Sequence, residues 1–320
     1  MELKLLLIVF SIFLAVNMGS SGFSVSFTPS FGSGLLDKKR SSLLYFIFLT
    51  FGGILIGWRV VETLSKRIST TTLGVESVVI IVFVCSIMML LSNLFKVPQS
   101  TSFVTVAAFS GASFYYKSIN FYTIWKIFFV AIIFSVVSFI LTYFIKKFLY
   151  PPRKSNFRLY EKLVYHNETL KKFIVYTDCY SAFAVGSNNI ANVVAPLVLT
   201  FDINVFLVIF VVGMFFGLGS LVMGGKLLKT VSKDIIPLGQ ISASVVSLAA
   251  STCAVLASIL GLPTPYVQFT VFSVLAISSV KESFYFTYRH QVVRRIIYVW
   301  FVVPIFTFLL SYVLHYFFKL

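Results

Sequence analysis

A polar stretch of small residues interrupts otherwise apolar sequence in the second half of the chain. It reads Val185-Gly186-Ser187-Asn188-Asn189-Ile190-Ala191-Asn192-Val193-Val194-Ala195-Pro196. In lipid each unpaired backbone or amide group costs several kcal/mol, so this stretch is expected to line a protected site. A helix interrupted here offers free backbone N–H groups and a positive dipole end, and both attract an anion. Ser187, Asn188, Asn189 and Asn192 add neutral donors and acceptors, which predicts an anion-binding site.

The spacing of two asparagines favours this interpretation. Asn188 and Asn192 are four residues apart, so they share one face of a helix, as the ligands of one site would. The alternative is that the small residues only allow two helices to approach closely.

A second group of hydroxyl side chains lies in the run Pro98-Gln99-Ser100-Thr101-Ser102. Three consecutive hydroxyls after a proline can cap a half-helix and also face an oxyanion. Ser100, Thr101 and Ser102 are therefore candidate ligands, and a simple capped helix start is the alternative. The equivalent run in the second half, Pro263-Thr264-Pro265-Tyr266, has lost most of the hydroxyls.

The polar stretch has a weaker copy near the start of the chain. At a constant offset of 167 positions the matching pairs are Gly19/Gly186, Ser20/Ser187, Pro29/Pro196, Gly52/Gly219, Gly57/Gly224, Arg59/Lys226, Thr63/Thr230, Ser65/Ser232 and Lys66/Lys233. This pattern predicts an internal duplication. Ser20 and Ser21 therefore join the candidate ligands.

The composition is that of an integral membrane protein. Of 320 residues, 58% are hydrophobic and 11% are charged, and the mean hydropathy is +0.97. Soluble chains carry about 25% charged residues. Apolar runs such as 121–145 and 203–223 reach the roughly 20 residues that a bilayer-spanning helix needs. We therefore expect an all-α membrane protein of several spans.

The net charge of +16 does not indicate nucleic-acid binding, because the cations lie mostly between apolar runs, where the positive-inside rule expects them. Cys85, Cys179 and Cys253 have the spacing of neither a disulfide framework nor a metal site. The first eighteen residues resemble a secretory signal. Cleavage near Ser20 would cut the first copy of the motif, so we predict a retained transmembrane helix.

The duplication divides the chain into a first repeat at 1–145, a basic cytoplasmic connection at 146–172 and a second repeat at 173–320. Equivalent points are separated by an odd number of predicted crossings, and the charges of equivalent loops differ as opposite orientations require. We therefore expect two inverted-topology repeats. The segment 19–34, rich in Gly, Ser and Pro, predicts a broken or re-entrant helix, and its motif should meet the second motif at a central site.

Three charged residues inside or beside apolar segments are functional candidates. Arg59 and Lys226 are equivalent in the two repeats and could form an anion vestibule, and the alternative is that they snorkel to the interface. Asp178 lies eight residues before Gly186 and is a candidate for ion coupling, and the alternative is a carboxylate at a helix end.

The motifs resemble those of the inorganic phosphate transporter (PiT) family. Gly186-Ser187-Asn188-Asn189-Ile190-Ala191-Asn192 is similar to its Gly-Ala-Asn-Asp-Val-Ala-Asn signature, and Pro98-Gln99-Ser100-Thr101-Ser102 to its Pro-Val-Ser-Thr-Thr element. The stretch Gly224-Gly225-Lys226 through Ile236-Pro237-Leu238 is similar to a third family motif. The resemblance implies transport of phosphate with a coupling cation. The signature aspartate, however, is Asn189 in the second copy and Gly22 in the first, and the first copy looks closer to the sulfate-permease branch.

The missing carboxylates favour sulfate over phosphate. Phosphate near neutral pH still carries a proton that it can donate to a carboxylate, whereas sulfate can only accept hydrogen bonds. We therefore predict a secondary active importer of an inorganic oxyanion, with sulfate favoured and phosphate as the alternative. Protons are the expected coupling ion rather than sodium, because no carboxylate remains in the motifs. An anion channel and an intramembrane enzyme are rival classes, but Ser187 has no His or Lys in its motif to activate it.

The sequence also bears on the partners of the protein and on its location in the cell. We expect no cofactor, no metal site and no nucleic-acid partner. The substrate is sulfate or phosphate, membrane lipid surrounds the protein, and a homodimer is one hypothesis for its assembly. The plasma (inner) membrane is the expected location.

Overall fold

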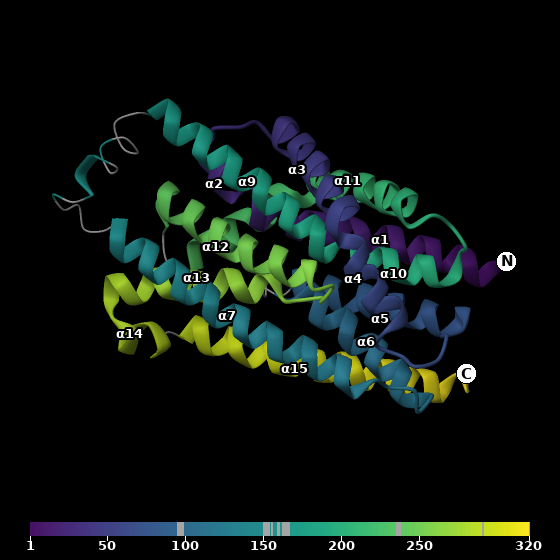
Figure 1. Ribbon diagram of the computed structural model, residues 1–320. Helices are drawn as coiled ribbons and strands as arrows, with labels where there is room; N and C mark the ends of the chain where they lie inside the picture. Colours follow the sequence, from purple (N-terminus) through teal and green to yellow (C-terminus); the bar gives the residue numbers. More distant parts are fainter. Residues whose placement is uncertain are drawn as a thin grey trace.

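Helices make up nearly all of the regular structure in the computed structural model (Figure 1). The structure describes residues 1–94, 99–149, 154, 156–158, 161, 167–234, 238–289 and 291–319. The predicted basic connection at 146–172 lies partly outside these residues, and Pro98 of the hydroxyl motif lies outside them as well.

The helices of the first half are α1 (Glu2–Ser26), α2 (Thr28–Gly32), α3 (Lys38–Gly52), the π-helix η1 (Gly53–Gly57), α4 (Trp58–Lys66), α5 (Val75–Leu94), α6 (Thr101–Tyr115) and α7 (Phe121–Leu149). Those of the second half are α9 (Asn167–Asn189), α10 (Ala191–Thr200), α11 (Val205–Asp234), α12 (Gln240–Ile259), α13 (Tyr266–Glu282), α14 (Phe284–Arg289) and α15 (Gln291–Phe317).

Eight helical segments of the described chain are long and apolar enough to cross a membrane. Two of them are composite, since α3, η1 and α4 run together over Lys38–Lys66, and α9 and α10 over Glu168–Thr200. The expected all-α membrane fold is confirmed. The helices that follow the two proline motifs are shorter, with fifteen residues in α6 and seventeen in α13.

Both motif copies contain a helix break, and the first break lies inside the segment 19–34 for which the sequence predicted one. Residues 19–26 continue α1 without interruption, and the helix stops only at Phe27, before the short α2. Pro29 explains this position, since it has no backbone N–H to continue the hydrogen bonds of α1 and is tolerated in the first turn of α2. In the second copy α9 ends at Asn189, inside the motif, and α10 starts at Ala191.

Matched glycines bring two pairs of helices into close contact. A Cβ atom on Gly19 of α1 would collide with the backbone carbonyl of Phe216 in α11, and one on Gly219 would collide with that of Val16. The second crossing, between α3 and α9, repeats this arrangement 167 positions away. There Gly186 lies against the carbonyl of Leu49, and Gly52 against that of Phe183. The glycine pairs of the predicted duplication thus occupy equivalent packing positions.

The wider packing follows the same pattern. α1 packs on α5 and α9 packs on α12, while α7 packs on α13 and α15 packs on α6. In Figure 1, α1, α3, α9 and α11 lie together, and α7, α13 and α15 lie across the bundle from them. Each contact has a counterpart in which every helix is replaced by its equivalent in the other half. A two-fold relation between the repeats predicts such pairs of contacts. The opposite orientation of the halves in the membrane stays a prediction.

Replacing Gly186 with alanine should destabilise the fold, because the new methyl group has backbone rather than a movable side chain in front of it. Overpacking of this kind costs about 1–3 kcal/mol. Gly32→Ala is the matched control, since its Cβ would lie 3.9 Å from the Thr28 Cγ2 atom, an ordinary contact. Thermal unfolding of the purified variants in detergent checks this, and equal midpoints for the two variants would contradict it.

Candidate functional site

Asn188 lies at the centre of a buried hydrogen-bond network that joins both halves of the chain. Its Oδ1 accepts from the Ser102 hydroxyl at 3.0 Å and from the Thr264 backbone N–H at 3.3 Å. Its Nδ2 donates to the Thr264 hydroxyl at 2.8 Å and to the Ser258 hydroxyl at 3.2 Å. The amide is fully buried and its hydrogen-bonding capacity is used. Asn188 therefore holds the starts of α6 and α13 against the break between α9 and α10.

The hydroxyl motif forms the first turn of α6. The Ser100 hydroxyl accepts from the Phe103 backbone N–H at 3.2 Å and caps the helix, so the capping interpretation is correct for this residue. Thr101 accepts from Asn192 Nδ2 at 3.4 Å. The start of α6 thus faces the second motif at two points, through Thr101 and through Ser102.

Several polar groups of the two motifs are buried without a partner in the described structure. They are both amide atoms of Gln99, the Oδ1 atoms of Asn189 and Asn192, and the Ser20 hydroxyl. Each such group costs about 1–3 kcal/mol when it is unpaired.

The remaining serines of the motifs bond to their own helices. The Ser187 hydroxyl donates to the Ala184 carbonyl, and the Ser21 hydroxyl donates to the Met18 carbonyl. The two motif copies do meet, because a Cβ on Gly22 would lie 3.1 Å from Val185 Cγ1. Among the described hydrogen bonds, none joins Ser20 or Ser21 to the Asn188 network. Their role as ligands stays a prediction.

Asp178 lies in the middle of α9 and is fully buried, so it is not a carboxylate at an exposed helix end. Its Oδ2 accepts from the Ser30 backbone N–H of α2 at 2.9 Å, and its Oδ1 has no partner. It takes part in none of the ion pairs of the described chain. The break after α1 is therefore tied directly to the carboxylate that the sequence suggested for coupling.

A tyrosine contacts the next turn of α9. The Tyr266 hydroxyl is bonded to the hydroxyl of Ser181, three residues after Asp178, at 2.5 Å and to the Ser251 hydroxyl at 3.1 Å. Tyr266 begins α13, two residues after Thr264. The short segment from Thr264 to Tyr266 thus connects the Asn188 network with the turn of α9 that follows Asp178.

Comparison with known proteins identifies the family. The model of the Phosphate transporter family matches residues 18–311. The chain belongs to this family. The sulfate permease CysP of Bacillus subtilis is 30% identical to it, over 98% of this chain and 87% of that protein. The sodium-dependent phosphate transporter 2 of Bos taurus is 30% identical over 143 residues, which are 41% of this chain and 22% of that protein.

The fold agrees with this assignment. A solved structure described as a sodium-dependent phosphate transporter has a TM-score of 0.82 and 18% identity, covering 100% of this chain and 99% of that chain. As a member of the phosphate transporter family with eight candidate spans, the chain is a multi-pass membrane transporter of inorganic anions and not an enzyme.

The chain departs from the phosphate transporter signature at Asn189 and Gly22, and the structure shows what surrounds Gly22. A Cβ on this glycine would collide with the Tyr45 hydroxyl, which is buried and has no partner. Tyr45 packs edge-on against Phe23 and Phe27. A neutral phenol thus occupies the space that a side chain at position 22 would need.

Of the two vestibule candidates, Arg59 and Lys226, the structure describes only the side chain of Arg59. The exposed Arg59 guanidinium donates to the carbonyl of Ile259, the last residue of α12, at 3.0 Å, and it lies over the Trp58 ring. This contact at the end of α12 favours the alternative that Arg59 lies at the membrane interface, and its vestibule role stays a prediction. Lys226 belongs to α11, and its side chain lies outside the described part of the structure.

Sequence reasoning missed several residues of the site. Thr264 and Tyr266 belong to the second proline motif, which lacks the run of hydroxyls, yet Thr264 bonds Asn188 and Tyr266 bonds Ser181 of α9. The equivalence of this motif to residues 98–102 was the available signal. Ser258, near the end of α12, is a further partner of Asn188. Tyr45 is unremarkable in sequence, since nothing in its local pattern indicates that it faces Gly22.

Proposed function

We propose that the chain is a secondary active importer of a tetrahedral oxyanion, with sulfate favoured and phosphate as the alternative. The supporting observation is the start of α6, where the buried Gln99 amide N–H has no partner and where Thr101 and Ser102 meet Asn192 and Asn188 of the second motif. The start of α6 adds backbone N–H groups at the positive end of a helix dipole. Neutral donors and a helix end can bind a dianion without a fixed countercharge.

The choice of sulfate rests on what surrounds the two positions without carboxylates. Asn189 is 6% exposed, and its amide can turn about its last torsion to offer N–H donors. Tyr45, beside Gly22, offers a neutral O–H. Both suit an anion that only accepts hydrogen bonds. The relative named as a sulfate permease, which matches nearly the whole chain, supports the same choice.

Protons are proposed as the coupling ion. Importing a dianion against a negative-inside potential costs about 2.3 kcal/mol per charge per 100 mV, so an accumulating importer needs accompanying cations. Asp178 is a buried titratable group that no lysine or arginine of the described structure pairs with. A proton can therefore bind and leave there. The protein would act in the plasma membrane, as a monomer or a homodimer.

The selectivity argument predicts a specific effect of Asn189→Asp. The new carboxylate repels both anions, but phosphate can compensate by donating its proton. Sulfate affinity should fall roughly ten-fold or more beyond any loss for phosphate, the scale of one hydrogen bond to a charged group. Competition binding with labelled sulfate and phosphate on the purified protein measures this.

Asn204→Asp is the matched control, since it places the same charge on an exposed residue before α11. It should leave the ratio of the two affinities unchanged. Equal losses for sulfate and phosphate in Asn189→Asp would remove the physical basis of the sulfate assignment and favour phosphate.

A further inference from the structure

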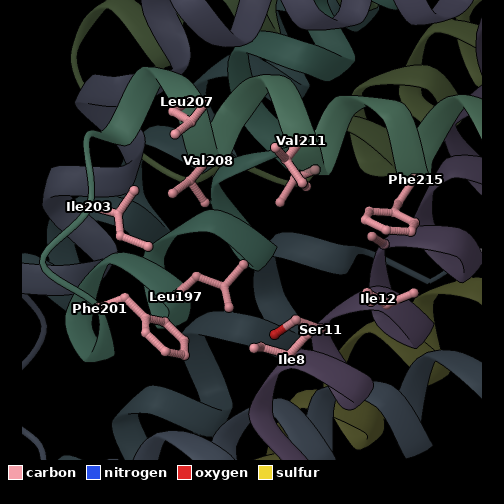
Figure 2. Close-up of a pocket in the computed structure, with 12 residues that line it drawn as sticks. Ile8, Ser11, Ile12, Leu197, Phe201, Ile203, Leu207, Val208, Val211 and Phe215 are labelled. Atoms are coloured by element: carbon pink, nitrogen blue, oxygen red, sulfur yellow. The ribbon is translucent and has the colours of Figure 1, made fainter. Parts of the chain in front are cut away.

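An apolar cavity of about 270 Å³ lies between α1, α10 and α11, away from the proposed anion ligands (Figure 2). Figure 2 shows Leu197 and Phe201 on one side of it and Leu207, Val208 and Val211 on another. Leu207 and Val211 are exposed, so the cavity opens on the lipid-facing side of the bundle. Its volume is below that of pockets for drug-sized ligands and suits part of an acyl chain.

One polar group borders this apolar space. Ser11 is the single residue with a polar side chain among the twelve that line the cavity, and it is 2% exposed. Its hydroxyl has no hydrogen-bond partner, not even the carbonyl one turn back on its own helix. Figure 2 shows this hydroxyl among the apolar side chains, beside Ile8 and Leu197. An occupant with an acceptor at this depth would satisfy it.

A cation marks one end of the same cavity. The Lys4 ammonium lies over the ring of Phe201, 5.6 Å from its centroid, and Phe201 lines the cavity. Lys4 is exposed and takes part in none of the ion pairs that the described residues form. The nearby Asp202 is exposed too and leaves Lys4 unpaired. The ammonium is therefore available to an anionic group.

The spacing along α1 connects these features. Lys4, Ile8, Ser11 and Ala15 follow the three- and four-residue steps that place side chains on one helix face. Lys4 and Ser11 are about 10 Å apart along the axis at 1.5 Å per residue. From the start of α1 the order is the Lys4 cation, then the Ser11 hydroxyl donor, with apolar side chains around it. A phospholipid has the matching order of phosphate, ester carbonyl and acyl chain.

We propose that this cavity is a binding site for an anionic phospholipid. Its phosphate pairs with Lys4, an ester carbonyl accepts from the Ser11 hydroxyl, and one acyl chain fills the space between α1, α10 and α11. The lipid would fix the crossing of α1 and α11, where Gly19 and Gly219 make their close contacts. The proposal is independent of which oxyanion is transported.

Phosphatidylglycerol and phosphatidylcholine are the probes, added to the purified full chain in detergent and counted on it by native mass spectrometry. We expect wild type to retain phosphatidylglycerol preferentially. Lys4→Ala should reduce this preference about five-fold, the scale of one lysine near an anionic surface. Lys39→Ala, an exposed lysine that follows the other end of α1, is the matched control and should change nothing.

Two further experiments test where the lipid binds. Val211→Trp, at an exposed position on the lining, should exclude the acyl chain and lower retention of both lipids. Phosphatidylglycerol with a photoreactive acyl chain should label peptides of α1 and α11. Equal retention of the two lipids by wild type, unchanged retention in Lys4→Ala, or labelling elsewhere would overturn the proposal. So would a dimer in which a second copy covers this face and excludes lipid.

Discussion

Replacing Asn188 with alanine should abolish oxyanion uptake and lower the stability of the protein. The side chain makes four buried hydrogen bonds, to Ser102, Ser258 and twice to Thr264. Its removal leaves the Ser102 hydroxyl and the two Thr264 groups without these partners, at about 1–3 kcal/mol each, while Ser258 keeps its bond to the Ala254 carbonyl. We therefore expect a loss of several kcal/mol in the free energy of unfolding. The starts of α6 and α13 would lose the residue that positions them.

Uptake of labelled sulfate into proteoliposomes, normalised to the folded fraction, separates the two effects. Asn204→Ala is the matched control, because Asn204 only caps α11 through a bond to the Phe206 backbone N–H. It should cost about 1 kcal/mol of stability without changing transport per folded molecule. Normal uptake by folded Asn188→Ala would exclude this network from the transport site.

The second large effect is expected for Asp178→Asn. The variant keeps the shape and can still accept from the Ser30 backbone N–H, but it cannot bind and release a proton. Proton-driven accumulation of sulfate should be lost, while exchange of internal for external sulfate continues. In wild type, uptake should rise as external pH falls, because protons drive it.

Asp202→Asn is the control for this variant, since it removes a carboxylate from an exposed loop. Its accumulation should equal that of wild type. Accumulation by Asp178→Asn at the wild-type level would place the coupling group elsewhere. If the variant lost both exchange and accumulation, the result would instead indicate a structural role, in which the carboxylate holds α2 against α9.

The helical architecture could be predicted from the sequence because hydrophobic runs and a repeated glycine pattern report directly on membrane helices and their crossings. The offset that pairs Gly19 with Gly186 reappears as two equivalent packing contacts. The exact break in the first motif could not be predicted, since Gly and Ser in the segment 19–26 are compatible with a helix that packs closely. Pro29 decided the position.

The sequence placed Asn188, Asn192, Thr101 and Ser102 in one candidate site, and their side chains do meet. That they bind an anion stays a prediction. Partners such as Ser258 and Tyr45 could not be found, because they come from helices whose apolar patterns carry no sign of what they face. Tertiary contacts of this kind are set by helix packing rather than by local sequence. The ligand roles of Ser187, Asn189, Ser20 and Ser21 stay predictions.

The central claim is tested most directly by uptake into proteoliposomes that contain the purified protein. Labelled sulfate and labelled phosphate are supplied separately under an inward proton gradient, and then under an inward sodium gradient at constant pH. The account predicts that sulfate accumulates under the proton gradient, that excess phosphate inhibits it weakly, and that sodium drives little uptake. Sodium-driven accumulation of phosphate, with sulfate excluded, would contradict it.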